Sequence, residues 1–248
     1  MTSCKTSLDR TRVPVPFDIL IEVAQHLNCD EDVKGIRSLS TVCHALRLPC
    51  QRRLFSSITL NHRLQSTDSD PWPHPRVEQG HIVRLRSCIE SNLQLASYVK
   101  NLYYTFWADE SPAIIPVLNR LKHLEVCAII SGDLFETFWS YIDPIRRDCL
   151  LAIIRGPHIK RLQFRGLAGI PLSVLDAPTL RCLKSEGTNF SPFNSSTTLP
   201  LKSLYMIWNE FGGENVLRSV VKHSPDLNFL RIYGKHLIPK VSLRLLIG

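Results

Sequence analysis

A six-residue pattern recurs from residue 99 onward, and it restricts the possible folds of this chain more than any other feature. The pattern is an apolar residue, a usually basic residue, any residue, leucine, any residue and an apolar residue. Such alternation is typical of a half-buried strand, and recurrence about every twenty residues is typical of a stacked solenoid. The copies are VKNLYY (99–104), LKHLEV (121–126), IKRLQF (159–164), LRCLKS (180–185), LKSLYM (201–206) and LNFLRI (227–232).

The central leucines lie 22, 38, 21, 21 and 26 residues apart, so one interval is unusually long. Two helices are expected to fill it. Asp133 with Glu136 resembles a capping box that starts the first helix, and Asp143-Pro144 starts a second one that ends at Gly156. The units resemble irregular leucine-rich repeats over residues 98–234. The alternative is an ordinary α/β layer whose strands share a leucine by chance.

In such strands the leucine and the apolar residue two positions later point inward, and the alternate side chains point outward on the concave side. An outward row of aromatic, basic and polar groups suits protein recognition, and it equally suits a solvated sheet. The row is Asn101, Tyr103, His123, Glu125, Arg161, Gln163, Cys182, Lys184, Ser203, Tyr205, Phe229 and Arg231. The candidate target-binding residues within it are Tyr103, Glu125, Arg161, Gln163, Lys184, Tyr205 and Arg231.

Residues 13–28, VPVPFDILIEVAQHLN, predict a helix that is apolar around most of its circumference. At 100° per residue the apolar side chains fill an arc of about 200°, roughly twice the stripe that an ordinary surface helix buries. Either this helix lies deep in a large core or another polypeptide covers its second face. The apolar residues are Phe17, Ile19, Leu20, Ile21, Val23, Ala24 and Leu27.

Two further short helices are expected before residue 60. One carries Ile36, Leu39 and Val42, and the next begins near Cys43 and is interrupted by Pro49. Several segments of residues 13–58 together resemble an F-box, and the whole chain resembles a fungal-type F-box protein with irregular leucine-rich repeats. The segments are the run Val15-Pro16-Phe17-Asp18-Ile19, the later aliphatic positions, Val42-Cys43 and the closing Leu54-Phe55. The resemblance implies docking on a Skp-family adaptor, which links F-box proteins to a cullin ubiquitin ligase. The residues expected to contact that adaptor are Pro16, Ile19, Leu20, Val23, Leu27, Leu39 and Val42.

The expected organisation is a helical module over 13–60, a polar, proline-rich linker over 61–76 and a repeat domain over 77–248. One helix from Ile82 to Ala96 should open the repeat domain, and another should span Glu214 to His223. The expected fold class is α/β (α+β), with an N-terminal three-helix F-box-like module followed by a short, irregular leucine-rich-repeat-like solenoid.

Composition and motifs limit the cellular compartment and the kinds of chemistry that we expect for this chain. The formal charge is +8, and the eight cysteines form no CxxC pair. With no secretory signal or membrane span in the sequence, no disulfide framework is expected, and the reducing cytoplasm or nucleus is the expected compartment. No nucleophile elbow, phosphate-binding loop or zinc spacing is present in the sequence. We therefore expect no catalytic residues, no metal and no cofactor, and conclude that the chain is not an enzyme.

The leading hypothesis is a substrate-recognition subunit that brings an unknown target protein to a ubiquitin ligase. The first alternative is a non-catalytic interaction scaffold in which the F-box-like helices form an intramolecular cap. The second and weaker alternative is a basic module that binds nucleic acid, whose affinity would fall steeply with salt.

Overall fold

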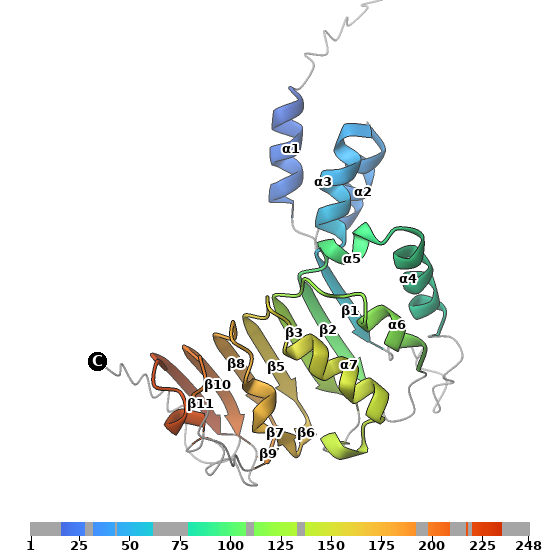
Figure 1. Cartoon of the computed structure of the whole chain (residues 1–248). Coiled ribbons are helices and arrows are strands. Elements are labelled where there is room, and N and C mark those ends of the chain that lie inside the picture. The colour runs from blue at the N-terminus through green and yellow to red at the C-terminus, as the bar shows by residue number, and fades with distance from the viewer. Residues whose placement is uncertain are drawn as a thin grey trace, which may run out of the picture. The chain divides into compact units, whose positions relative to one another are not determined.

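The computed structural model describes residues 16–27, 32–42, 44–61, 79–107, 112–132, 137–191, 198–208, 217 and 220–234 (Figure 1). The chain divides into two compact units, which we call the helical unit (residues 1–54) and the sheet unit (residues 55–248). All strands of the described residues lie in the sheet unit. The protein therefore combines helices with a parallel sheet, as the expected α/β class requires.

The helical unit contains α1 (Phe17–His26), α2 (Val33–Val42) and α3 (His44–Leu54). The expected interruption at Pro49 is wrong, because α3 runs through this residue. Leu46 and Cys50 lie on either side of the proline and are fully buried. Their burial offsets the backbone hydrogen bond that a proline inside a helix cannot donate. Together with Ala24 and Ile36 they form the core of the unit.

The sheet unit is built on a seven-stranded parallel sheet whose strands follow one another in chain order (Figure 1). Each of these strands therefore pairs with the one before it and the one after it in this order. Because the strands are parallel, each connection must cross back over the sheet. The strands are β1 (Ser57–Asn61), β2 (Asn101–Phe106), β3 (Val126–Ser131), β5 (Arg161–Arg165), β8 (Cys182–Glu186), β10 (Ser203–Trp208) and β11 (Phe229–Gly234).

β1 corrects the sequence analysis, which placed these residues at the end of the helical module. Ile58 and Leu60 are buried and pair in register with Leu102 and Tyr104 of β2. The alternation of apolar residues in Ser57–Asn61 is that of a strand, and the division between the two units falls at Leu54, ahead of it. Most of the predicted linker over 61–76 lies outside the described residues.

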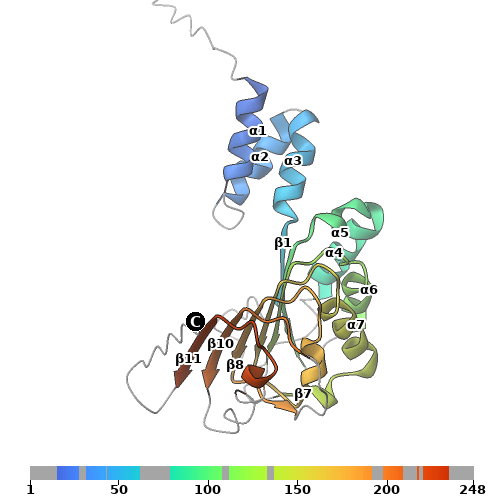
Figure 2. The same cartoon turned by 60° about the vertical axis from the view of Figure 1, so that its left-hand side comes forward.

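The described helices of the sheet unit cover one face of the sheet, and none of them covers the other (Figure 2). They are α4 (Gln79–Ser91), α5 (Gln94–Tyr98), α6 (Ile115–Leu118) and α7 (Pro144–Ile154). Residues 217 and 220–222 are also helical, which agrees with the helix predicted from Glu214 to His223 where the structure describes it. The single helix expected from Ile82 to Ala96 is divided in two after Ser91. The Asn92 side chain accepts a 3.1 Å hydrogen bond from the Gln94 amide, and such local bonds favour a break in a helix.

The long interval between the second and third copies holds a short strand as well as a helix. α7 begins as predicted, with the Asp143 side chain accepting a 3.0 Å hydrogen bond from the Arg146 amide. The helix expected from Asp133 is wrong where the structure describes it, because β4 (Thr137–Phe138) and a 3₁₀ turn (Trp139–Tyr141) occupy this segment. Asp133 and Glu136 lie outside the described residues.

Short strand pairs and 3₁₀ turns complete the sheet unit at the ends of the main strands. β4 pairs with β6, and β7 pairs with β9. The remaining elements are β6 (Leu167–Ala168), β7 (Ile170–Pro171), β9 (Phe190–Ser191) and the 3₁₀ turns Pro112–Ile114 and Leu172–Leu175.

Parallel pairing places the repeated leucines in one buried row across the sheet. The second copy of the pattern departs from the prediction, because Cys127 and not Leu124 pairs with Leu102 and Leu162. Leu121 and Leu124 are also buried, but in the turn before β3. The row is Ile58, Leu102, Cys127, Leu162, Leu183, Leu204 and Leu230.

None of the described helices is long and apolar enough to cross a bilayer.

Candidate functional site

The face of the sheet opposite the helices, which we call the outer face, brings together five of the seven predicted target-binding residues. These five occupy one register row, in which each pairs with the equivalent position of the neighbouring strand. Thr59 and Ala128 complete the row on β1 and β3. The five are Tyr103, Gln163, Lys184, Tyr205 and Arg231.

The other two predicted target-binding residues lie outside this row. Arg161 is exposed two residues before Gln163, and therefore still on the outer face. Glu125 precedes β3 and is not in a strand. His123, which the sequence analysis also placed in the outward row, lies in the same turn. The wrong predictions for Glu125 and His123 both follow from the shifted register of the second copy of the six-residue pattern.

Aromatic and charged side chains of the last two strands interact on the outer face. The ring centroids of Tyr205 and Phe229 are 4.9 Å apart, and the Arg231 guanidinium lies 4.7 Å from the centroid of the Tyr233 ring. Rigid aromatic rings beside an arginine are enriched at protein interfaces. This part of the outer face is therefore suited to binding a protein surface.

Two cysteine thiols of the sheet are kept in the neutral form by their surroundings. Burial raises the pKa of Cys127, in the leucine row, to about 12. Burial also raises the pKa of Cys182 on the outer face, and the neighbouring Arg161 cation opposes this shift only in part. A thiol is a nucleophile only as the thiolate, so neither environment activates its cysteine.

The second candidate surface lies on the helical unit. Five large apolar side chains of its described residues are exposed, one more than the four hydrophobic residues in its buried core. Ile19 and Val23 lie one turn apart on α1 and are 49% and 44% exposed, and Val42 at the end of α2 is 66% exposed. The other two are Phe17 and Leu48.

A shallow hollow of about 360 Å³ runs along the exposed side of α1. It is lined by Ile19, Glu22, Val23, His26 and Leu27. An apolar floor between one acidic residue and one histidine resembles the grooves in which partner helices or loops bind. The hollow thus lies on the face for which the sequence predicted a partner.

The predicted adaptor-binding residues divide into two groups in the structure. Pro16, Ile19, Val23 and Val42 are exposed. Leu20, Leu27 and Leu39 are half-buried and pack against the core of the helical unit. The second group therefore positions the helices, and it offers a partner only part of each side chain. Phe17 and Leu48 are also exposed but were not among the predicted adaptor-binding residues, although Phe17 belongs to the apolar arc of the predicted helix.

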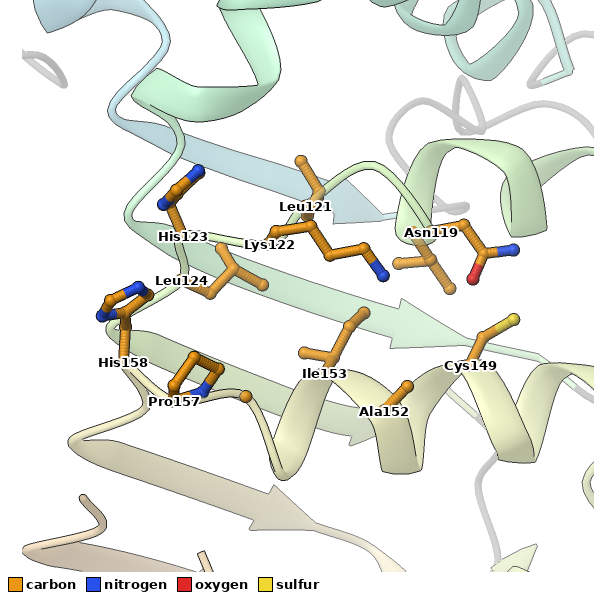
Figure 3. Close-up of a pocket in the computed structure, with 12 residues that line it drawn as sticks. Asn119, Leu121, Lys122, His123, Leu124, Cys149, Ala152, Ile153, Pro157 and His158 are labelled. Atoms are coloured by element: carbon orange, nitrogen blue, oxygen red, sulfur yellow. The ribbon is translucent and has the colours of Figure 1, made fainter. Parts of the chain in front are cut away.

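A pocket of about 340 Å³ lies on the helix-covered side of the sheet, between α7 and the turn before β3 (Figure 3). Its apolar wall includes Ile153 and Leu124, and the rings of His123 and His158 lie at one end. These two rings stack with centroids 5.7 Å apart. The described residues contain no group of three histidine, cysteine or acidic side chains that could hold a metal ion.

No family model matches this chain. A search of curated proteins also gives no match.

Proposed function

We propose that this chain is the substrate-recognition subunit of a Skp/cullin/F-box ubiquitin ligase. In this proposal the helical unit is an F-box that docks on a Skp-family adaptor. The observation that carries the proposal is that, among the described residues of the helical unit, five large apolar side chains are exposed and only four hydrophobic residues are buried. An apolar surface of this kind is typical of a binding site, and its sequence resembles the F-box pattern.

The sheet unit is proposed to be a short, irregular leucine-rich-repeat-like solenoid that binds the target protein. Strands in chain order, parallel pairing and a continuous leucine row support this interpretation. The helix-free outer face supplies the binding surface, with Tyr103, Tyr205 and Arg231 among its contact residues. Binding there raises the effective concentration of the target near the ligase, so this chain itself needs no catalytic residue.

The proposed compartment is the cytoplasm or the nucleus, where Skp-family adaptors and cullin ligases assemble. The buried thiols of Cys127 and Cys149, which form no disulfide, are compatible with a reducing compartment.

The test is co-purification of the full chain with a Skp-family adaptor. The variant carries Ile19→Asp and Val23→Asp, which place two charges in the hollow on α1. Because burying an unpaired charge at an apolar interface is costly, we expect adaptor capture to fall at least about tenfold. The matched control carries Val83→Asp and Leu93→Asp, which alter two side chains of the sheet unit that are 54% and 57% exposed.

Capture that is lost in the first variant and kept in the control supports the proposal. Unchanged capture in the first variant, or no capture by the unmodified chain, overturns it. Circular dichroism of both variants verifies that the helices remain folded. We expect both variants to pass this check, because Ile19 and Val23 lie outside the buried core of the helical unit.

A further inference from the structure

The residue directly before each main strand forms a continuous row at the amino-terminal ends of the strands. In five copies of the six-residue pattern this residue is the second, usually basic position, whereas in the second copy the shifted register places Glu125 there. Backbone hydrogen bonds fix this row: the Arg181 amide donates to the Lys160 carbonyl at 2.9 Å, and the Lys202 amide donates to the Arg181 carbonyl at 2.8 Å. We call it the edge row. Its members are Ser56, Lys100, Glu125, Lys160, Arg181, Lys202 and Asn228.

The edge row carries four cations and one carboxylate. That carboxylate, Glu125, accepts a 2.7 Å hydrogen bond from the Lys160 ammonium. The Lys160 hydrogen bond, together with the charges of Lys160, Lys100 and His158, lowers the pKa of Glu125, although its partial burial opposes the shift. Glu125 is therefore ionised at neutral pH and neutralises part of the charge between Lys100 and Lys160. The excess positive charge is greatest across β5, β8 and β10.

The cations of these three strands are presented to solvent. Lys160 is 60% exposed in spite of its ion pair, and Arg161 and Lys202 are exposed. The Arg181 guanidinium donates to three carbonyls, those of Pro178, Leu180 and Pro200, at 3.2 to 3.4 Å. These bonds hold one positive charge in a fixed place between the two flexible lysines.

We propose that Lys160, Arg161, Arg181 and Lys202 bind an acidic segment of the target protein. This inference rests on the proposed function, because it specifies which kind of target the outer face and its amino-terminal edge receive. Adjacent strands are about 4.8 Å apart, so the three strands span about 10 Å, and an extended chain covers that distance in about three or four residues. The expected recognition element is therefore a short run of aspartates or glutamates.

Charge and size favour an acidic peptide over nucleic acid. The carboxylate of Glu125 borders the basic stretch on one side, and Asp226 precedes the row position of β11 on the other. A long polyanion that extended along the whole row would approach both carboxylates. Nucleic-acid affinity grows with the number of phosphates neutralised, and a stretch of three strands neutralises few of them.

The experiment measures binding of fluorescein-labelled octaglutamate to the full chain by fluorescence anisotropy at low and high salt. The charge-reversed variant carries Lys160→Glu, Arg161→Glu and Lys202→Glu. Because three exposed attractions become repulsions, we expect affinity to fall at least about tenfold. Replacing the same residues with glutamine should produce a smaller loss and guards against misfolding of the charge-reversed protein.

The matched control reverses three exposed cations of the sheet unit that lie on α4 or shortly after α6 and outside the edge row, with Arg84→Glu, Arg86→Glu and Arg120→Glu. We expect its affinity for octaglutamate to stay within about twofold of the unmodified chain, because distant exposed charges are screened by salt. An equal loss in this control shows a general charge effect and overturns the proposal. No binding of octaglutamate at low salt also overturns it.

A single-stranded oligonucleotide with eight phosphates serves as the competing probe. Tighter binding of the oligonucleotide than of octaglutamate assigns the edge row to nucleic acid and overturns the proposal. Neither probe requires the adaptor, and adaptor capture requires neither probe. Failure of this inference is therefore distinguishable from failure of the proposed ligase function.

Discussion

The Glu125 carboxylate accepts a 2.7 Å hydrogen bond from the Lys160 ammonium, which joins the residues that precede two adjacent strands. Both side chains are partly open to solvent, with exposed fractions of 38% and 60%. Solvent and salt therefore screen the pair, and its contribution to stability is small. It nevertheless lowers the pKa of Glu125, and the direction of this shift determines how the contribution depends on pH.

Glu125→Gln should destabilise the sheet unit by about 0.5 kcal/mol or less at neutral pH and low salt. A carboxyl whose pKa is lowered by folding stabilises the protein above its unfolded pKa, about 4.3. The stabilisation is lost as the pH falls through the lower, folded value. Urea unfolding followed by tryptophan fluorescence should therefore show a difference at pH 7 that shrinks as the pH falls below about 4.3. A difference that grows on acidification would contradict the assigned shift.

Cys127 should resist alkylation in the folded protein. Because burial raises the pKa of its thiol to about 12, the thiolate is almost absent at pH 8. Among the cysteines that the structure describes, iodoacetamide should modify the exposed Cys88 first and leave Cys50, Cys127 and Cys149 unmodified. Peptide mapping by mass spectrometry measures each site separately. Guanidinium-unfolded protein, in which every thiol should react, is the control, and rapid native labelling of Cys127 would argue against a buried leucine row.

Gly166→Ala should destabilise the sheet unit by about 1–2 kcal/mol, because Gly166 has φ +66° and an L side chain is strained there. Gly35→Ala is the matched change in the helical unit. Gly35 lies within α2, and an added Cβ would meet no atom within 4 Å. Alanine should therefore stabilise α2 by about 0.5–1 kcal/mol. Urea unfolding followed by fluorescence and by circular dichroism measures the two changes, and equal signs would contradict the backbone geometry.

Removing residues 1–54 should leave a folded sheet unit, whereas removing residues 1–76 should destabilise it. The longer deletion removes β1 and exposes the edge of β2, together with the core contacts of Ile58 and Leu60. An exposed, apolar strand edge promotes aggregation. Thermal unfolding and size-exclusion chromatography compare the two fragments. Identical behaviour would argue against β1 as part of the sheet, and aggregation of both would favour the helices as an intramolecular cap.

Local periodicity was enough to predict the repeated strands, because each has alternating side chains that one face must bury. It was not enough to set the register of the second copy. LKHLEV matches the pattern, but Leu121 and Leu124 fill the turn before β3. The strand itself, Val126–Ser131, contains a run of buried residues without alternation. Its register is determined by pairing with β2 and β5, which are distant in the sequence.

The candidate surfaces, like the strands, were predictable from the sequence only in part. Tyr103, Gln163, Lys184, Tyr205 and Arg231 were predictable because alternation places them on one face. Four members of the edge row, Lys100, Lys160, Arg181 and Lys202, were already visible as the basic position of the pattern. Only parallel pairing shows that they are adjacent and that Glu125 lies among them. β1 was missed because it directly follows α3 and its partner strand begins forty residues later, at Asn101. The F-box resemblance concerns a partner, which stays a prediction.

The chain-order arrangement of the sheet has a consequence for the order in which it forms. The register residues of β5, β8 and β10 are separated by only 21 residues each, Leu162 to Leu183 and Leu183 to Leu204. Ile58 and Leu102 are separated by 44 residues. Since the entropy lost on closing a loop increases with its length, nucleation is favoured among β5, β8 and β10. β1 should be the last strand to join the sheet and the first to detach under mild denaturation.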